Sequence, residues 1–176
     1  MRPIRKPHTP KKSKPSTLEI CAIVISILAL FTTTYQSYLT KVHNLKSVEP
    51  RVNAYKQFEN DYKIVIFNNG LGPAFVEKIT YFANGEPLET DSLVPAMTQL
   101  GVEVMCYTFG MPRPGDSFKK EEEVFLIKIK NNTACSPSKF RFMTLKDSEF
   151  DFEILYSSIY GEQFHYRYST NQQSKL

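Results

Sequence analysis

Cys106, Cys135 and His165 are the side chains after residue 46 that could carry covalent chemistry. A thiol beside an imidazole can act as a nucleophile with its general base, whereas two thiols in an oxidising compartment often form a disulfide. A histidine between Phe164 and Tyr166 on an alternating strand is more typical of a surface residue than of a base. Two interpretations therefore stay open. Either the cysteines pair, or Cys106 is a buried thiol on a strand and Cys135 a loop thiol.

Catalytic motifs are missing from the sequence. It contains no phosphate-binding glycine loop, no G-x-G-x-x-G, no H-E-x-x-H and no G-x-S-x-G. A structural metal site needs about four ligands, more than two cysteines and one histidine supply. We therefore expect no catalytic residue, no metal and no cofactor, and we interpret the protein as a non-enzyme.

Two polar segments between apolar runs are candidate binding loops. The segment 68–74 reads NNGLGPA, and its glycines allow either a tight turn or a backbone-lined ligand contact. The segment 156–162 reads YSSIYGE, and tyrosine and serine serve binding loops well. Each segment also fits a plain turn, so both interpretations stay open. The candidate binding residues are Asn68, Asn69, Gly70, Gly72, Tyr156, Ser157, Tyr160 and Glu162.

Short runs of alternating apolar and polar residues must position these loops. Eight or nine such runs are separated by turn residues, and only 92–100 could form a short helical turn. Asn84 and Gly85 form a strong hairpin signal. This pattern predicts a mainly β domain, an antiparallel β-sandwich that is immunoglobulin-like in architecture only, since the chain has no tryptophan. The expected strands cover 52–58, 62–67, 74–82, 86–88, 102–109, 125–129, 140–145, 150–156 and 164–168.

An apolar run near the N-terminus predicts a transmembrane helix. Leu18 to Leu39 comprises 22 residues, or about 33 Å of helix at about 1.5 Å per residue. Tyr35 and Tyr38 stand where an interfacial aromatic belt would lie. The run lacks an Ala-x-Ala cleavage pattern after its apolar core. We therefore favour an uncleaved signal anchor over a cleaved signal peptide or a buried core helix.

Charge predicts the orientation of this single-pass anchor. Six Lys and Arg residues precede the apolar run and three follow it closely, which by the positive-inside rule puts the N-terminus in the cytoplasm. Residues 1–46 carry a net charge of +7 and residues 47–176 a net charge of −3. Because the head alone makes the chain basic, we expect its partner to be the lipid bilayer and expect no nucleic acid.

These observations predict five parts. They are a basic disordered cytoplasmic head (1–17), a transmembrane helix (18–39), a juxtamembrane linker (40–48), a β-sandwich domain (49–170) and a disordered tail (171–176).

Three segments carry a resemblance: YQSYLTKVHNLKSVEPR (35–51), NNGLGPA and YSSIYGE. With them the chain resembles a widespread group of uncharacterised small bacterial single-pass inner-membrane proteins. The resemblance implies a bacterial inner-membrane protein with a periplasmic β-domain, and it implies no catalytic residue. The leading hypothesis is a membrane-anchored extracytoplasmic binding module of unknown ligand, which holds a partner protein, a peptide or an envelope component near the membrane. Another envelope or membrane protein is one candidate partner. The alternative is an accessory membrane subunit of a bacterial stress or phage-defence system.

Overall fold

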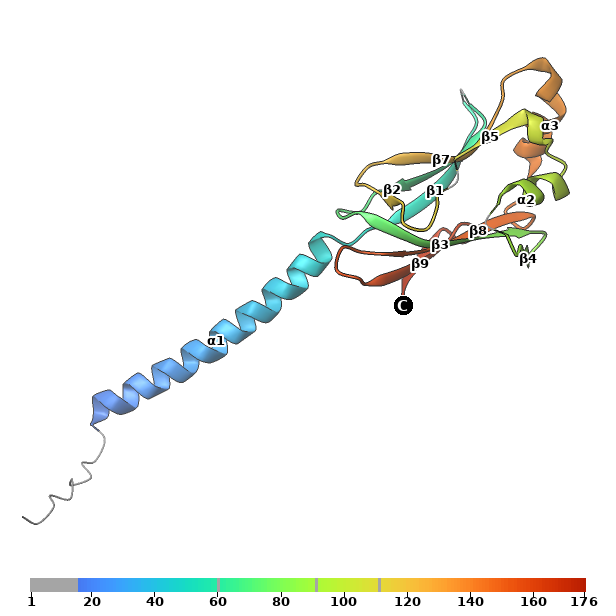
Figure 1. The fold of residues 1–176 in the computed structure, drawn as a ribbon. Coiled ribbons are helices and arrows are strands. Elements are labelled where there is room, and N and C mark those ends of the chain that lie inside the picture. The colour runs from blue at the N-terminus through green and yellow to red at the C-terminus, as the bar shows by residue number, and fades with distance from the viewer. Residues whose placement is uncertain (1–15, 60, 91, 111) are drawn as a thin grey trace, which may run out of the picture. The chain divides into compact units, whose positions relative to one another are not determined.

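The computed structural model describes residues 16–59, 61–90, 92–110 and 112–176. Most of the predicted basic head, residues 1–15, lies outside this part of the chain. The chain divides into two units, 1–43 and 44–176, and each is described by itself. The described residues of the first unit form one helix, and the second unit is the β-domain (Figure 1).

Helix α1 (Thr17–Ser47) begins at a capping box. The Ser16 hydroxyl accepts a hydrogen bond from the Glu19 N–H (3.3 Å), and the Glu19 carboxylate accepts one from the Ser16 N–H (2.7 Å). The helix continues through most of the predicted linker 40–48, and it ends shortly before Pro50.

The surface of α1 suits an apolar environment. No residue of the helix is buried in the protein, and its large apolar side chains, such as Phe31, are exposed. The hydroxyls of Ser26, Thr32 and Thr33 donate to the carbonyls four residues earlier, each at 2.8 Å. Such bonds satisfy polar groups where water is absent. The helix is therefore long and apolar enough to cross a membrane.

The second unit consists of two antiparallel sheets with short helices at one end (Figure 1). The first sheet has the strand order β1-β2-β7-β5, and the second has β10-β9-β8-β3-β4 with β6 paired to β3. The strands are β1 (Val52–Gln57), β2 (Lys63–Asn68), β3 (Ala74–Ala83), β4 (Glu86–Pro87), β5 (Tyr107–Phe109), β6 (Ser117–Phe118), β7 (Glu123–Ile129), β8 (Phe150–Ser157), β9 (Gln163–Arg167) and β10 (Gln172–Lys175). The helical segments are α2 (Val94–Gln99), η1 (Val104–Cys106), η2 (Thr133–Cys135) and α3 (Ser136–Thr144).

The inner faces of the two sheets share one core. Alternate residues of β8 and β9 point inward, so that Phe152, Tyr156 and Tyr166 are completely buried. Phe152 also stacks on Tyr168, with the ring centroids 4.9 Å apart. The large aromatic content of the sequence thus fills the space between the sheets. The predicted Asn84-Gly85 turn is confirmed, since both residues have positive φ and join β3 to β4.

The prediction of a strand over 140–145 is wrong, because this segment lies mostly in α3. The sequence Phe140, Phe142, Thr144 suggested alternation, but burial follows helical spacing: Ser138 and Phe142 are buried and Phe140 is 70% exposed. Pro137 stands in the first helical turn, a position that proline favours. That start signal outweighs a three-residue alternation.

The predicted strand over 102–109 is too long. The segment forms the 3-10 turn η1 and the three-residue strand β5. Cys106 donates its N–H to the Glu103 carbonyl (2.9 Å), which is turn geometry. Met105 is consequently 82% exposed, whereas Cys106 and Tyr107 are both buried.

The prediction of a disordered tail over 171–176 is also wrong. Residues Gln172–Lys175 form β10, which pairs with β9 from Arg167 to Phe164. The polar sequence NQQSKL gives no apolar alternation, and side-chain amides hold the strand instead. Asn171 accepts a hydrogen bond from the Tyr166 hydroxyl (2.9 Å), and Gln173 accepts one from the Tyr156 hydroxyl.

Tyrosine hydroxyls close the outer edge of β1. The Val52 N–H donates to the Tyr156 hydroxyl (3.4 Å), and the Ala54 N–H donates to the Tyr166 hydroxyl (2.9 Å). Both tyrosines belong to the opposite sheet, so these bonds also join the sheets. Burial raises the pKa of Tyr166 to about 12. The hydroxyl therefore stays protonated, able to accept from Ala54 while it donates to Asn171.

Replacing Tyr166 by phenylalanine tests this edge closure. Tyr166→Phe leaves the buried Ala54 N–H without its partner, and we expect the free energy of unfolding to fall by about 1–3 kcal/mol. Tyr55→Phe is the control, because the exposed Tyr55 hydroxyl makes only a 3.4 Å contact with Glu123. Chemical denaturation of the full-length protein in detergent measures both. Equal small effects would contradict the proposed role of the Tyr166 hydroxyl.

Candidate functional site

Asn68, the first of the predicted binding residues, is completely buried and acts inside the fold. Its amide nitrogen donates to the carbonyls of Gly72 (2.7 Å) and Phe118 (3.0 Å). Its amide oxygen accepts from the N–H groups of Gly70 (2.9 Å) and Arg51 (3.0 Å). These four bonds use the full capacity of the side chain. Asn68 therefore shapes the loop and is closed to a ligand.

Gly70 and Gly72 are in close contact with the chain that follows α1. A Cβ on Gly72 would lie 1.9 Å from the Val48 carbonyl oxygen, and one on Gly70 would lie 2.3 Å from the Arg51 nitrogen. Asn69 donates its N–H to the Arg51 carbonyl (3.0 Å) in the same contact. The glycines allow one backbone to pack on another. We call residues 48–54, held in this way, the attachment segment.

The second predicted loop is a turn organised by Ser158. The Ser158 hydroxyl accepts from the N–H groups of Tyr160 (3.2 Å) and Glu162 (3.3 Å). Tyr156 is buried under β1, and the Glu162 carboxylate pairs with Lys175 of β10. The remaining predicted residues are the half-buried Ser157, which pairs with Phe75 of β3, and the exposed Tyr160 at the tip.

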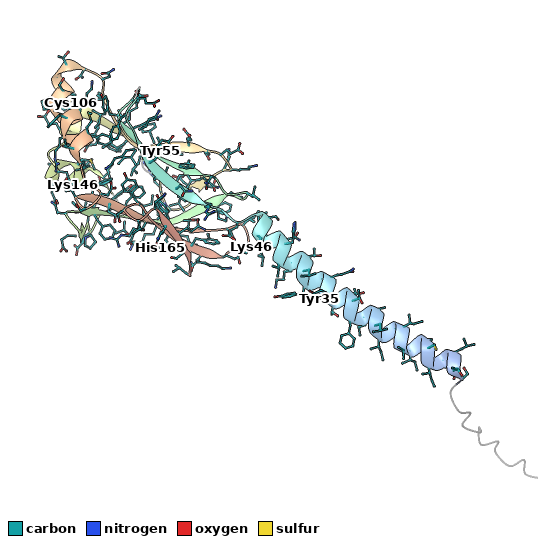
Figure 2. The ribbon with its side chains drawn as sticks, turned by 180° about the vertical axis from the view of Figure 1, so that it is seen from behind. Tyr35, Lys46, Tyr55, Cys106, Lys146 and His165 are labelled. Carbon is teal, nitrogen blue, oxygen red and sulfur yellow. A yellow bond between two sulfur atoms is a disulfide. The ribbon has the colours of Figure 1, made fainter. Side chains whose placement is uncertain are left out.

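The structure joins Cys106 to Cys135 in a disulfide between η1 and η2. His165 lies on β9 beside the Glu153 carboxylate, with 3.3 Å between the Nε2 and Oε2 atoms. Figure 2 shows Cys106 and His165 well apart. The structure therefore does not bring a thiol and the imidazole together as a nucleophile and base.

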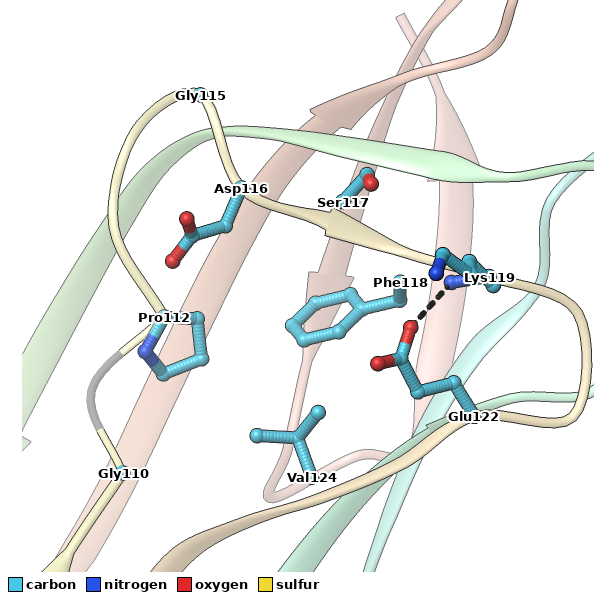
Figure 3. Close-up of a pocket in the computed structure, with 9 residues that line it drawn as sticks. All are labelled: Gly110, Pro112, Gly115, Asp116, Ser117, Phe118, Lys119, Glu122 and Val124. Carbon is cyan, nitrogen blue, oxygen red and sulfur yellow. Dashed lines mark hydrogen bonds between the residues drawn. The ribbon is translucent and has the colours of Figure 1, made fainter.

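A cleft of about 490 Å³ lies beside the connection between β5 and β7 (Figure 3). Phe118 and Val124 form its apolar part, and Asp116 and Glu122 lie at its rim. Both carboxylates accept hydrogen bonds from turn amides: Asp116 from the Arg113 N–H (2.7 Å) and Glu122 from the Lys119 N–H (2.8 Å). These acids therefore shape the loops that border the cleft.

Four exposed apolar side chains lie on elements at the end of the sandwich where β1 ends. The pairing of Gln57 with Lys63, Lys63 with Lys128 and Tyr107 with Ile129 places η1 and η2 at this end. The attachment segment enters at the other end. The exposed side chains are Val104 (46%), Met105 (82%), Phe140 (70%) and Met143 (51%). We call these four the distal apolar surface.

Covalent and polar bonds hold the elements of this surface together. The disulfide links η1 to the segment that leads into α3. The Ser138 hydroxyl accepts from the Glu103 N–H (3.3 Å), and the Arg141 Nε donates to the Leu100 carbonyl (2.7 Å). The hydrogen bond from Arg141 lowers the pKa of Glu149 to about 2, so that this pair stays charged throughout the physiological pH range.

A groove of about 490 Å³ adjoins the distal apolar surface. It is lined by Val102, Val104, Met105, Thr98 and Gly101, with Glu103 as its charged member. Flexible methionines beside an apolar groove are typical of surfaces that bind other proteins. Sequence reasoning missed these residues because it placed 102–109 and 140–145 in strands. The signals that could have found them are Pro137 and the two cysteines that bracket the region.

Comparisons with known proteins gave no match: no protein-family model, no curated protein and no solved structure matches this chain.

Replacing Gly72 by alanine tests the packing of the attachment segment. Because the added Cβ would overlap the Val48 carbonyl, we expect Gly72→Ala to lower the free energy of unfolding by about 2–3 kcal/mol. Leu71→Ala in the same loop is the control, since Leu71 is 59% exposed, and its effect should stay within about 0.5 kcal/mol. If Gly72→Ala were as stable as this control, the loop would not hold the segment.

Counting thiols tests the disulfide. Denatured protein purified without reductant should take up one maleimide, at Cys21, and three after reduction. Intact-mass spectrometry measures the difference. The double variant Cys106→Ala/Cys135→Ala should lose about 2–4 kcal/mol of unfolding free energy. Uptake of three maleimides before reduction would show that the cysteines are not paired.

Proposed function

We propose that this protein is a membrane-anchored interaction module that binds another protein through the distal apolar surface. The observation that carries the proposal is the exposure of Met105 and Phe140, at 82% and 70%, on elements held rigidly by a disulfide. Exposed apolar side chains cost solvation free energy, and a bound partner would remove them from water. The proposal requires no catalytic step.

In this proposal α1 crosses a bacterial inner membrane as an uncleaved anchor. Its length and its apolar surface on all sides support the crossing. The excess of Lys and Arg before the helix supports a cytoplasmic N-terminus and a periplasmic domain. An oxidising compartment would also suit the disulfide between Cys106 and Cys135.

We also propose that the sandwich has immunoglobulin-like topology. Antibody-type sandwiches have one sheet in the order A-B-E-D and another that contains C-F-G. Here β1-β2-β7-β5 fits the first order, and β4-β3-β8-β9 fits C′-C-F-G. The loops that correspond to antibody binding loops are 69–73 and 158–162. The first loop packs against the attachment segment and is therefore covered. This contact supports binding at the distal end instead.

Site-specific photo-cross-linking tests this function. With p-benzoylphenylalanine at Met105 or Phe140 of the full-length protein in membranes, we expect adducts with one and the same protein. The same probe at Leu71 or Ile159 is the matched control, because both residues are 59% exposed and lie in the two predicted binding loops. Adduct mass and identity are read by gel electrophoresis and mass spectrometry.

The charge substitution Met105→Lys, combined with the probe at Phe140, should reduce the adduct about tenfold, since a buried ammonium opposes apolar contact. Met105 is exposed, so this change should leave the free energy of unfolding within about 0.5 kcal/mol. Adducts from Leu71 and Ile159 but none from Met105 and Phe140 would move the binding site to the loops and contradict the proposal.

A further inference from the structure

The geometry points to strand β5 as an acceptor for β-strand addition: an extended segment of the partner protein pairs with its outer edge. This inference rests on the proposed function, because β5 directly follows η1, which carries Val104 and Met105 of the distal apolar surface. In β-strand addition, main-chain hydrogen bonds supply affinity and alternate side chains supply specificity. The two sheets have four outermost strands: β1, β5, β10 and β4.

Three of these edges carry features that oppose strand addition. The N–H groups of Val52 and Ala54 on β1 are occupied by tyrosine hydroxyls. Strand β4 has only two residues, and Pro87 has no N–H to donate. Strand β10 is polar and carries Lys175, a typical edge-protecting residue.

Strand β5 differs in sequence from the other three edges. Residues 104–110 read VMCYTFG and contain no charge and no proline. Thr108 is exposed and Phe109 is 37% exposed, so that the strand offers apolar and uncharged polar contacts together. Its neighbour η1 lines the groove of about 490 Å³.

Backbone alternation shows which groups of β5 face outward. The Lys130 N–H donates to the Cys106 carbonyl (2.8 Å), so residue 106 faces β7. In an antiparallel pair every second residue faces the same neighbour. Thr108 therefore faces β7, while the N–H and C=O groups of Tyr107 and Phe109 face the outer side. Strand β7 is the one neighbour of β5 in the sheet, as the described residues form it.

These features define the chemistry of the partner segment. It is extended, pairs antiparallel or parallel with Tyr107–Phe109, and alternates apolar with polar side chains. One apolar side chain fits the groove beside Val104 and Met105. Such a segment needs no charge match, since residues 104–110 carry none.

Peptide binding to the full-length protein in detergent micelles tests the inference. The probe is a fluorescent nine-residue peptide of alternating valine and threonine with a lysine at each end, and the control is the same peptide N-methylated at every valine and threonine, so that neither of its edges can donate. Both carry the same side chains, but only the first can pair with a strand edge. We expect the N-methylated peptide to bind at least about tenfold more weakly, because it loses two or more hydrogen bonds.

Two variants locate the binding on β5. Phe109→Pro removes one outward N–H while the β7 side of the strand is kept, whereas Phe109→Ala removes the same ring and keeps the N–H. We expect the proline variant to bind the unmethylated peptide about tenfold more weakly than the alanine variant. Residue-resolved hydrogen exchange should show new protection of the Tyr107 and Phe109 amides when the peptide binds.

Three outcomes would overturn this inference. None of them bears on the proposed function, which the photo-cross-linking experiment tests separately. Equal binding of the two peptides would show recognition by side chains alone. Absence of binding at millimolar peptide would exclude β5 as an acceptor. Protection of Tyr107 and Phe109 that rises with protein concentration in the absence of peptide would identify a second copy of the chain as the occupant instead. Cross-links from Phe140 to a partner would support the proposed function in each case.

Discussion

The hydrogen bonds and close backbone packing that hold residues 48–54 against the sandwich are the constraint on which the rest of the domain depends. Asn68 and the two glycines of the 68–74 segment contact the backbone of this stretch. Tyr156 and Tyr166 of the opposite sheet accept hydrogen bonds from its N–H groups. Gln173 adds a bond from its amide nitrogen to the Pro50 carbonyl (3.2 Å). The stretch is thereby bonded to the sandwich, and its Val52 and Ala54 belong to the core. Residues 48–54 occupy one end of the sandwich, and the proposed function places the partner at the opposite end.

Much of the fold could be predicted from the sequence because most strands alternate cleanly between core and solvent. The β8 and β9 segments are the clearest, since every second residue is an aromatic or branched side chain that the structure buries. The β10 strand could not be predicted in this way. Its residues are polar, and it is held by backbone pairing with β9 and by the amides of Asn171 and Gln173. Short polar edge strands owe their order to their neighbours rather than to their own pattern.

The candidate site was harder to predict than the fold. The two segments that looked most like binding loops were correctly placed between strands, yet Asn68 and Tyr156 are fully buried and bond to the protein's own backbone. An asparagine with four internal partners and one facing a ligand look identical in sequence. Met105 and Phe140 posed the opposite problem, because an apolar residue is expected inside. Only the turn at η1 and the helix α3 put these side chains in water.

Residue-resolved amide hydrogen exchange of the full-length protein in detergent tests the central claim most directly. If the sandwich holds residues 48–54 through these bonds, the amides of Val52 and Ala54 should exchange only when the whole sandwich opens. Their protection would then match that of the central β8 amides within about tenfold. The account would be contradicted if Val52 and Ala54 exchanged at the rate of an unstructured chain while β8 stayed protected. Residues 48–54 would then not be held by the sandwich.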